Sequence, residues 1–463
     1  MRDVAQKPRF GAKPQPLRQD GPGRIDLTLS SSDHPTAHPM HAAIVLLVLI
    51  LTYIGMAAGR IAWLQVDRTG IALLAVIALL ASGEMTLDDF GSAVDMPTLA
   101  LLFAMMIISA QLAESGFIDL CARTILDAKG GTAALLALTV AISGALSAVL
   151  ANDILIITIA PLLIAGAQRR GLDPRPFAIA LAASANAGSA ATLIGNPQNI
   201  LLGAVGRLDF WEFLGICGVP AVFALVTVFA VVWLQWGRRM QDHPPQPEAL
   251  PVPVAGHILD RNQTIKGGGA VFLLLLLFAT PLPREIGALI IAALLLANRK
   301  ITSRTMIAAV DWPLLLFVSC LFAITGQLND SGIAYQVLSF IDNHGLLPNN
   351  LIVLLPFAAV TSNAIGSLST AMLLLQIWPS PPPGALYALA LLSTLAGSLF
   401  LSGSLTNLLI AEQAERMGAR LSFGQFARTG VPIAVLSLAF AVFWLAAMHV
   451  LPLFPPPSAP PVP

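Results

Sequence analysis

From residue 42 to residue 451 the chain alternates apolar stretches with short polar loops. A membrane-spanning helix needs about 20 apolar residues, or about 17 at the short end. Several stretches are shorter than this, so we expect the helices to extend beyond their edges. The pattern predicts an all-α integral membrane protein, whose apolar stretches are 42–58, 70–82, 97–112, 132–168, 176–205, 213–236, 267–280, 285–297, 312–328, 349–377, 385–411 and 431–451.

Two of these stretches are interrupted near the middle by polar residues. Asn152 and Asp153 interrupt 132–168, and the sequence Thr-Ser-Asn at 361–363 interrupts 349–377. Polar backbone at membrane depth is tolerated only where protein or a water-filled cavity shields it. We therefore expect each stretch to form a re-entrant hairpin, in which two helices joined by a polar tip return to the side from which they entered.

The two halves of the chain share three sequence patterns in the same order. Residues 95–116 and 311–332 both begin with Asp-x-Pro and end with Gln-Leu-x-x-Ser-Gly. The hairpin tips SAVLANDI and AAVTSNAI match next, and Ala-Gly-Ser followed by Gly-x-x-x-Asn then recurs in AGSAATLIGNPQN and AGSLFLSGSLTN. Chance could produce one such match, but the shared order predicts a duplicated fold.

Each half is expected to contain about five transmembrane helices and one hairpin. A hairpin returns to its own side, so an odd number of crossings makes the second half enter from the opposite face. The prediction is an inverted repeat with discontinuous helices at the membrane midplane, as in many secondary transporters. The expected segments are a disordered N-terminal tail at 1–41, a first transmembrane repeat at 42–236, a cytoplasmic linker at 237–266, a second repeat at 267–451 and a short C-terminal tail at 452–463.

Composition and charge exclude several other classes of protein. Charged residues make up 11% of the 463 residues, against roughly 25% in soluble proteins, which leaves too little polar surface for a soluble enzyme. A net charge of zero without basic blocks argues against nucleic acid as a partner. Loops on one predicted side carry 17 Lys and Arg residues and those on the other carry two. The first side is therefore expected to face the cytoplasm of a bacterium, across its inner membrane.

The N-terminal tail conflicts with this orientation. Its six Lys and Arg residues fall on the outer side. The conflict disappears if translation begins at Met40 rather than Met1, or if one helix near the start is counted wrongly.

Asp153 is the one ionisable residue well inside an apolar stretch. A carboxylate within a membrane costs about 2.5–3.5 kcal/mol on insertion scales, which makes it a functional candidate. In apolar surroundings a carboxyl group binds a proton more readily than in water. Alternatively its oxygens, with those of Asn152 and Asn199, bind Na+. The coupling ion is therefore expected to be H+ or Na+, with no other cofactor, although Asp153 could instead cap the helix that follows it.

Polar residues gather at two further interruptions, within 176–205 and 385–411. The sequence Gly-Asn-Pro-Gln-Asn at 195–199 combines a proline, which removes an amide donor, with a glycine that permits a bend. It predicts an unwound segment, as does Gly-Ser-Leu-Thr-Asn at 403–407, although small residues also serve close helix packing. The candidate substrate- and ion-binding residues are Asn152, Asp153, Ser184, Asn186, Ser189, Thr192, Asn196, Asn199, Ser362, Asn363, Ser398, Thr406 and Asn407.

Other recognisable sites are missing from the sequence. There is no His-Glu-x-x-His metal motif and no phosphate-binding Gly-x-x-x-x-Gly-Lys-[Ser/Thr] motif, which argues against an ATP-driven pump. Three cysteines lie far apart, which argues against a disulfide framework. Gln111 and Gln327 stand at equivalent helix ends of the two halves and are expected to be structural.

The sequences SAVLANDILIITIAPLL, GNPQNILLG and SLSGSLTNLLIAEQA resemble those of the ion transporter superfamily. That group includes citrate-transporter-like permeases, arsenite permeases, Na+/H+ antiporters of similar fold and divalent-anion:sodium symporters. The resemblance spans roughly 42–451 and implies a substrate-carrying domain that moves like an elevator against a scaffold, often in a homodimer. The positions that match its motifs are Asn152, Asp153, Asn196, Asn199, Ser362, Asn363 and Asn407.

One departure from the superfamily bears on the substrate. The dicarboxylate branch carries Ser-Asn-Thr at its hairpin tips, whereas the tips here are Ala-Asn-Asp and Ser-Asn-Ala. This favours an arsenite-permease-like or another anion-permease branch.

Two functions remain open from the sequence. The first is a secondary active transporter that moves a small anion or a neutral oxyacid with H+ or Na+. The second is a Na+/H+ antiporter on the same scaffold, which fits equally well because no Lys or Arg falls within the predicted site. A channel or a membrane-embedded enzyme is disfavoured, because no continuous polar path and no nucleophile–base pair is found.

Overall fold

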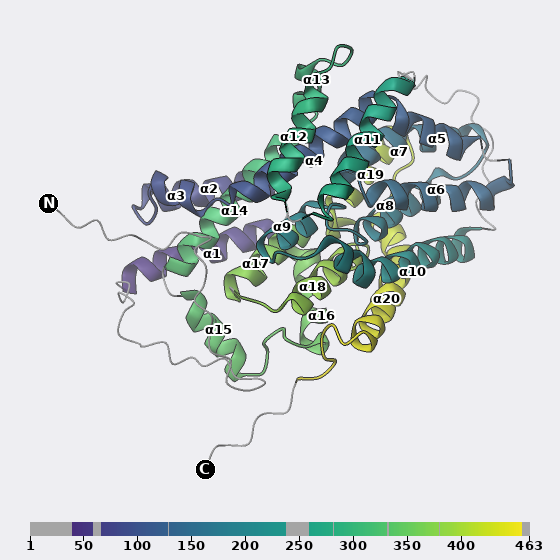
Figure 1. Ribbon diagram of the computed structural model, residues 1–463. Helices are drawn as coiled ribbons and strands as arrows, with labels where there is room; N and C mark the ends of the chain where they lie inside the picture. The colour runs from purple at the N-terminus through teal and green to yellow at the C-terminus, as the bar shows by residue number, and fades with distance from the viewer. Residues whose placement is uncertain are drawn as a thin grey trace.

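The computed structural model describes residues 39–58, 66–127, 129–237, 259–280, 282–330, 333–378 and 380–455. The regular structure of these residues is helical, which confirms the predicted all-α class (Figure 1). Most of the predicted tail at 1–41 and of the linker at 237–266 lies outside the described residues.

The helices of the first half end with a long apolar helix at Trp236. They are α1 (Pro39–Ala58), α2 (Arg68–Ala81), α3 (Leu87–Ala93), α4 (Met96–Glu114), α5 (Phe117–Leu126), α6 (Gly131–Ser147), α7 (Asn152–Arg169), α8 (Pro174–Ser189), α9 (Pro197–Val205) and α10 (Phe210–Trp236).

The second half begins at Arg261 and ends with a comparable long helix. Its elements are α11 (Arg261–Leu277), α12 (Arg284–Leu296), α13 (Ser303–Ala308), α14 (Trp312–Asp330), α15 (Ile333–Asn343), α16 (Leu351–Ile365), α17 (Ser367–Ile377), α18 (Pro383–Ala396), the 3-10 turn η1 (Leu401–Gly403), α19 (Leu405–Arg416) and α20 (Phe423–Ala447).

The elements of the second half follow the same order as those of the first. Helices α2, α3, α4 and α5 begin 216 positions before α12, α13, α14 and α15, at 68, 87, 96 and 117 against 284, 303, 312 and 333. A helix pair, a broken helix and a long helix then follow in each half. The repeated sequence patterns therefore correspond to a repeated series of helices.

The apolar pattern missed four short helices, α3, α5, α13 and α15, which fall in or beside the expected loops. Helix α5 explains why: it buries Ile118, Ala122 and Ile125 on one side and exposes Leu120 on the other. A helix with one apolar face lacks the continuous apolar run that marks a spanning helix.

The second hairpin breaks later than expected. We predicted the interruption at 361–363, but α16 continues to Ile365 and the chain turns at Gly366, whose φ is +93°. The polar side chains do not interrupt the helix because they bond back into it. Thr361 Oγ1 donates to the Phe357 carbonyl (2.6 Å) and Asn363 Nδ2 to the Ala359 carbonyl (2.9 Å). Glycine alone tolerates the backbone conformation that the turn requires.

The broken helices α8 and α18 lie at the centre of the molecule, and α10 and α20 pack together beside them (Figure 1). The first part of α8 belongs to one apolar core with α5, α6 and α7, and its last turns belong to another with α4, α14 and α18. At Gly188 a Cβ atom would lie 2.1 Å from the Gly144 carbonyl oxygen. This close approach of α8 to α6 places the broken end of α8 beside the first hairpin.

Four helices of the described part of the chain are long and apolar enough to cross a membrane: α4, α7, α10 and α20. Shorter apolar helices accompany them, including α6 of the first hairpin, both arms of the second hairpin and α18. In the second hairpin and the second broken helix, the interruption divides one apolar stretch between two shorter helices.

Candidate functional site

A single asparagine bridges the two parts of the first broken helix. Helix α8 ends at Ser189 and α9 begins at Pro197. Across this gap, Asn199 Nδ2 donates to the carbonyls of Ser189 (3.1 Å) and Thr192 (2.8 Å). These carbonyls lose their helical partners at the break, so the buried side chain supplies the hydrogen bonds that the backbone cannot.

The second broken helix repeats this arrangement at the same spacing. Asn407 Nδ2 donates to the carbonyls of Gly397 (2.8 Å) and Phe400 (3.0 Å), which precede it by ten and seven positions, as Ser189 and Thr192 precede Asn199. Both acceptors are carbonyls in each case, so only the NH2 group can face them. This fixes the orientation of both amides.

The two breaks are joined to each other by reciprocal hydrogen bonds. Asn196 Nδ2 donates to Thr394 Oγ1 (3.2 Å), and Ser404 Oγ donates to Asn186 Oδ1 (3.1 Å). Asn196 and Ser404 hold equivalent positions in the two motifs. The structure therefore brings the two predicted interruptions together, through the candidate residues Asn186 and Asn196 and through Thr394 and Ser404, which were not among the candidates.

One further bond exists in only one half. Asn186 Nδ2 donates to Asn407 Oδ1 (3.0 Å). Counted back from the bridging asparagines, Thr394 precedes Asn407 by 13 positions, as Asn186 precedes Asn199, but its hydroxyl donates to the Ala390 carbonyl (2.7 Å) within its own helix. Asn199 Oδ1 is consequently buried without a hydrogen-bond donor, whereas Asn407 Oδ1 has one.

The first hairpin tip leads into the helix that carries Asp153. The chain leaves α6 at Ser147 and enters α7 at Asn152, whose Oδ1 accepts a bond from the Ser147 hydroxyl. The Ala151 amide donates to Ser109 Oγ on α4 (3.0 Å). The tip is thus anchored on both sides, and the interruption lies at 148–151, close to its predicted place.

Asp153 lies half-buried in the first turn of α7. Ala151 occupies the N-cap position, so Asp153 does not cap this helix as the alternative interpretation required. No hydrogen bond or ion pair reaches its carboxylate from the described residues. Asp153 therefore has no ionic partner among the described residues and is not the N-cap of its helix. A bound cation or a proton would compensate its negative charge.

The second hairpin tip has a cation beside it that sequence analysis missed. A Cβ atom on Gly366 would lie 2.9 Å from Arg68 Nη1, so the guanidinium of Arg68, at the start of α2, rests against the tip of the other half. No hydrogen bond to the Arg68 side chain comes from the described residues. The repeat offset could have drawn attention to it, because Arg68 and Arg284 are equivalent.

Three buried amide oxygens of the site have no hydrogen-bond donor among the residues that the structure describes: Gln198 Oε1, Asn199 Oδ1 and Asn363 Oδ1. Each belongs to a side chain whose nitrogen is engaged, as with Asn363 Nδ2, which donates to the Ala396 carbonyl (2.9 Å). Unpartnered buried acceptors are costly, by about 1–3 kcal/mol each. They suit a ligand that brings hydrogen-bond donors or positive charge, such as Na+ or the hydroxyls of an oxyacid.

Some candidates serve chiefly in packing or are placed nearby without bonds. Ser184 Oγ contacts Ser143 Oγ between α8 and α6, Ser189 Oγ donates to the Asn186 carbonyl (3.0 Å), and Thr192 Oγ1 bonds the Ala148 carbonyl. Ser362 Oγ lies 3.5 Å from the Ala359 carbonyl. Two candidates are buried at the second break without a side-chain hydrogen bond in the described part of the chain, Ser398 and Thr406.

The described residues contain no group of three or more His, Cys, Asp or Glu side chains that could hold a metal ion. Paired hairpins and interrupted helices that enclose polar groups are instead features of membrane transporters. The chain belongs to the citrate transporter family (CitMHS), whose family model matches residues 44–381. It is therefore an integral membrane transporter rather than an enzyme, and the predicted membership of the ion transporter superfamily is confirmed.

Individual relatives agree with this assignment. The chain is 24% identical over 424 residues to an uncharacterized transporter of Mycobacterium tuberculosis, covering 87% of this chain and 98% of that protein. It is 33% identical over 163 residues to a silicon efflux transporter of Oryza sativa subsp. japonica, covering 35% of this chain and 33% of that one. The crystal structure of the Alcanivorax borkumensis YdaH transporter has the same fold, with a TM-score of 0.59, 16% identity and coverage of 90% and 99%.

Proposed function

We propose that the protein is a secondary active transporter that moves a small anion or an oxyacid across a bacterial inner membrane, coupled to H+ or Na+. The observation that carries the proposal is the asymmetric site at the paired breaks. Unpartnered carbonyl oxygens and the uncompensated carboxylate of Asp153 favour positive charge, while the guanidinium of Arg68 beside the second tip favours an anion. A site with both features suits the joint transport of a cation and an anion.

The two halves are proposed to be inverted repeats. The repeated order of helices and the equal spacing of the Asn199 and Asn407 bonds support a duplicated fold. An odd number of crossings in each half would then place the second copy upside down, with the two hairpins opening to opposite sides and the broken helices meeting at the midplane.

The coupling ion is proposed to bind in the first half, at Asp153, Asn152 and Asn199. The free Asn199 Oδ1 and the carboxylate supply oxygen ligands, which hard cations prefer. A proton on Asp153 would serve the same purpose, because it removes a charge that no neighbour compensates. Either ion would make substrate binding depend on a gradient.

The substrate is proposed to contact Asn363, Ser362 and Arg68 at the second tip. A guanidinium offers planar paired donors that match a carboxylate or another oxyanion, and the free Asn363 Oδ1 accepts a bond from a hydroxyl. The family is described as citrate transporters and one relative as a silicon efflux transporter. An organic anion and a neutral oxyacid are accordingly the two substrate types to compare first.

A Na+/H+ antiporter is the second candidate function. The three acceptor oxygens and Asp153 favour it, because they need only cations. Arg68 opposes it, since a guanidinium beside the site would repel a second cation.

The two functions can be separated with the purified protein in proteoliposomes. Uptake of labelled citrate, arsenite and silicic acid is measured under imposed Na+ or H+ gradients, together with gradient-driven Na+ flux in the absence of any substrate. The proposal predicts accumulation of an anion or oxyacid only when one of the two gradients is present. Na+ flux driven by a pH gradient without such a substrate would instead establish the antiporter.

A further inference from the structure

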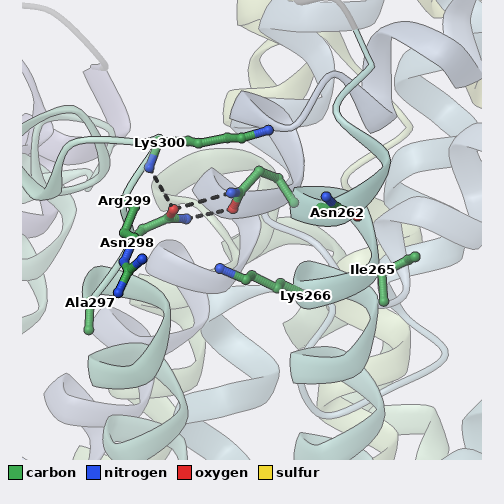
Figure 2. A pocket seen from close by; sticks show the side chains of 8 residues that line it. Asn262, Ile265, Lys266, Ala297, Asn298, Arg299 and Lys300 are labelled. Atoms are coloured by element: carbon green, nitrogen blue, oxygen red, sulfur yellow. Dashed lines mark hydrogen bonds between the residues drawn. The ribbon is translucent and has the colours of Figure 1, made fainter.

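A second polar site lies away from the broken helices, between the start of α11 and the end of α12. It is a cavity of about 540 Å³. Figure 2 shows Lys266 extending from α11 toward α12, below the hydrogen bonds that link the two helices. The residues that line the cavity are Asn262, Gln263, Ile265, Lys266, Ala297, Asn298, Arg299 and Lys300.

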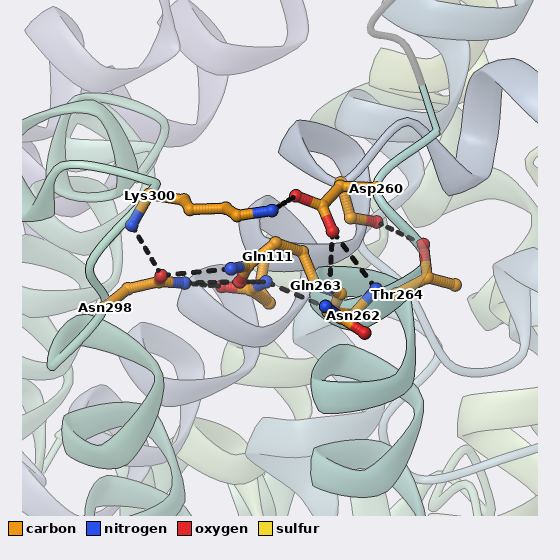
Figure 3. A network of polar contacts seen from close by, with 8 residues as sticks. Gln111, Asp260, Asn262, Gln263, Thr264, Asn298 and Lys300 are labelled. Carbon is orange, nitrogen blue, oxygen red and sulfur yellow. Dashed lines mark hydrogen bonds and ion pairs between the residues drawn. The ribbon is translucent and has the colours of Figure 1, made fainter.

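A network of amides from α4, α11 and the segment that follows α12 borders this cavity (Figure 3). Gln111 Nε2 on α4 donates to Gln263 Oε1 (3.1 Å), and Asn298 Nδ2 donates to the same oxygen (2.6 Å). Gln263 Nε2 in turn donates to Asn298 Oδ1 (3.2 Å). The amides satisfy one another, so ligand binding is left to the charged side chains around them. Gln111, which the sequence predicts to be structural, takes part in this network.

Two of the three charged side chains that line the cavity have no ion-pair partner in the part of the chain that the structure describes. Lys300 Nζ forms an ion pair with Asp260 Oδ2, which lowers the pKa of that carboxyl group. Lys266 and Arg299 make no ion pair with any described residue. The cavity therefore collects two uncompensated cations, a combination that an anionic ligand would stabilise.

The surface that continues from the cavity is apolar and exposed. Along α11, Leu273 and Leu276 follow Lys266 at intervals of seven and ten residues, on the same face of the helix, and both are about half exposed. On α12, Ile290 and Leu294 are 57% and 67% exposed. Cations at the end of an apolar helix face match the two parts of a phospholipid, a charged headgroup and its acyl chains.

We propose that this cavity binds the phosphate of an anionic phospholipid, with the acyl chains lying along the exposed faces of α11 and α12. Lys266 and Arg299 bind the phosphate. A free phosphate compound would leave the apolar face unused, and a second copy packed through a twofold axis would bring the same cations together. These residues also belong to loops that the distribution of Lys and Arg assigns to the cytoplasmic side, where anionic lipid headgroups attract basic residues.

The proposal predicts that an anionic lipid stabilises the folded transporter, independently of what it transports. Thermal unfolding of the full-length protein is followed in neutral detergent with phosphatidylcholine, while phosphatidylglycerol is titrated in; a parallel titration uses inorganic phosphate alone. Phosphatidylglycerol should raise the melting temperature to saturation. Lys266→Gln/Arg299→Gln should increase the half-saturating concentration by about tenfold or more, because each basic residue near a lipid surface contributes about 1 kcal/mol.

The matched control removes two exposed cations outside the cavity, as Arg304→Gln/Arg420→Gln. It should leave the half-saturating concentration of phosphatidylglycerol unchanged. The proposal fails if phosphatidylcholine stabilises the protein equally, if inorganic phosphate alone reproduces the effect, or if the control pair weakens the response as much as the cavity pair does.

Discussion

Asn199 and Asn407 hold equivalent places in the two halves. Their amide nitrogens make equivalent hydrogen bonds, but their amide oxygens differ in whether a donor reaches them. Each amide nitrogen bridges a broken helix through two carbonyls. Asn407 Oδ1 accepts a hydrogen bond from Asn186 Nδ2, whereas Asn199 Oδ1 has no hydrogen-bond donor among the described residues, and the Thr394 hydroxyl donates within its own helix. Where the two halves differ in the side chains Asn186 and Thr394, the oxygen of Asn199 is thus a candidate ligand and the oxygen of Asn407 is not.

The two hairpin tips also differ from each other, in charge and in the way the chain turns. The first carries Asp153 and turns through four residues, while the second has Ala364 at the matching position and turns at Gly366 beside Arg68. The first tip therefore carries the negative charge of Asp153 and the second lies beside the positive charge of Arg68, whereas unpartnered amide oxygens occur in both halves, at Gln198, Asn199 and Asn363. The two halves thus share a backbone arrangement and differ in the charge at their hairpin tips.

The two bridging asparagines should differ in their effect on stability. Asn407→Ala leaves two carbonyls and the Asn186 amide without partners, whereas Asn199→Ala leaves only two carbonyls. At the lower end of the range of about 1–3 kcal/mol for each unpaired buried group, we expect Asn407→Ala, with three such groups, to lower the free energy of unfolding by roughly 3 kcal/mol, and Asn199→Ala, with two, by about 1 kcal/mol less. Thermal unfolding in detergent measures both, and equal losses would contradict the difference between the halves.

The hairpin turns should differ in their need for glycine. Gly366→Ala forces a side chain into a conformation with φ of +93° and toward Arg68, which should cost about 1–3 kcal/mol. The reverse substitution at the other tip, Ala151→Gly, alters a residue with φ of −60° and should cost under about 1 kcal/mol. Comparable melting temperatures for the two variants would show that the turns do not differ as described.

We expect the two equivalent arginines to differ in role, with Arg68 in substrate binding and Arg284 in structural stability. Arg284 Nη1 donates to the Leu208 carbonyl (2.6 Å) and its guanidinium lies over Phe278, so Arg284→Gln should reduce stability and leave KM unchanged. Arg68→Gln should raise the KM of an anionic substrate by about tenfold, equivalent to about 1.4 kcal/mol. Uptake kinetics in proteoliposomes test this, and an unchanged KM in Arg68→Gln would remove Arg68 from the substrate site.

Sequence patterns predicted the features that depend on local composition. Polar residues within apolar runs located the first hairpin tip and both broken helices, because interruptions of this kind need polar groups nearby. The same reasoning misplaced the second turn, because Thr361 and Asn363 satisfy their hydrogen bonds inside α16 and the glycine decides where the chain turns. Composition shows that polar groups are present, and geometry determines which of them break a helix.

The sequence patterns could not predict contacts between segments that lie far apart in the chain. Arg68 lies almost 300 positions from Gly366, at 68 and 366 in the chain, and only folding brings them together. Whether the oxygen of Asn199 has a hydrogen-bond donor depends on the orientation of the side chains around it, and a sequence motif does not contain this information. The predicted site therefore contained the asparagines that the structure places at the two breaks, but not the arginine beside the second tip or the difference between the two halves.

The central claim is that the carboxylate of the first half couples transport to an ion gradient. The most direct test compares Asp153→Asn with the wild type in proteoliposomes, using exposed Glu412→Gln as the control. The claim predicts that Asp153→Asn retains substrate exchange at equilibrium but loses accumulation driven by a H+ or Na+ gradient, together with its dependence on pH or Na+. Gradient-driven uptake with unchanged pH and Na+ dependence in Asp153→Asn would contradict it.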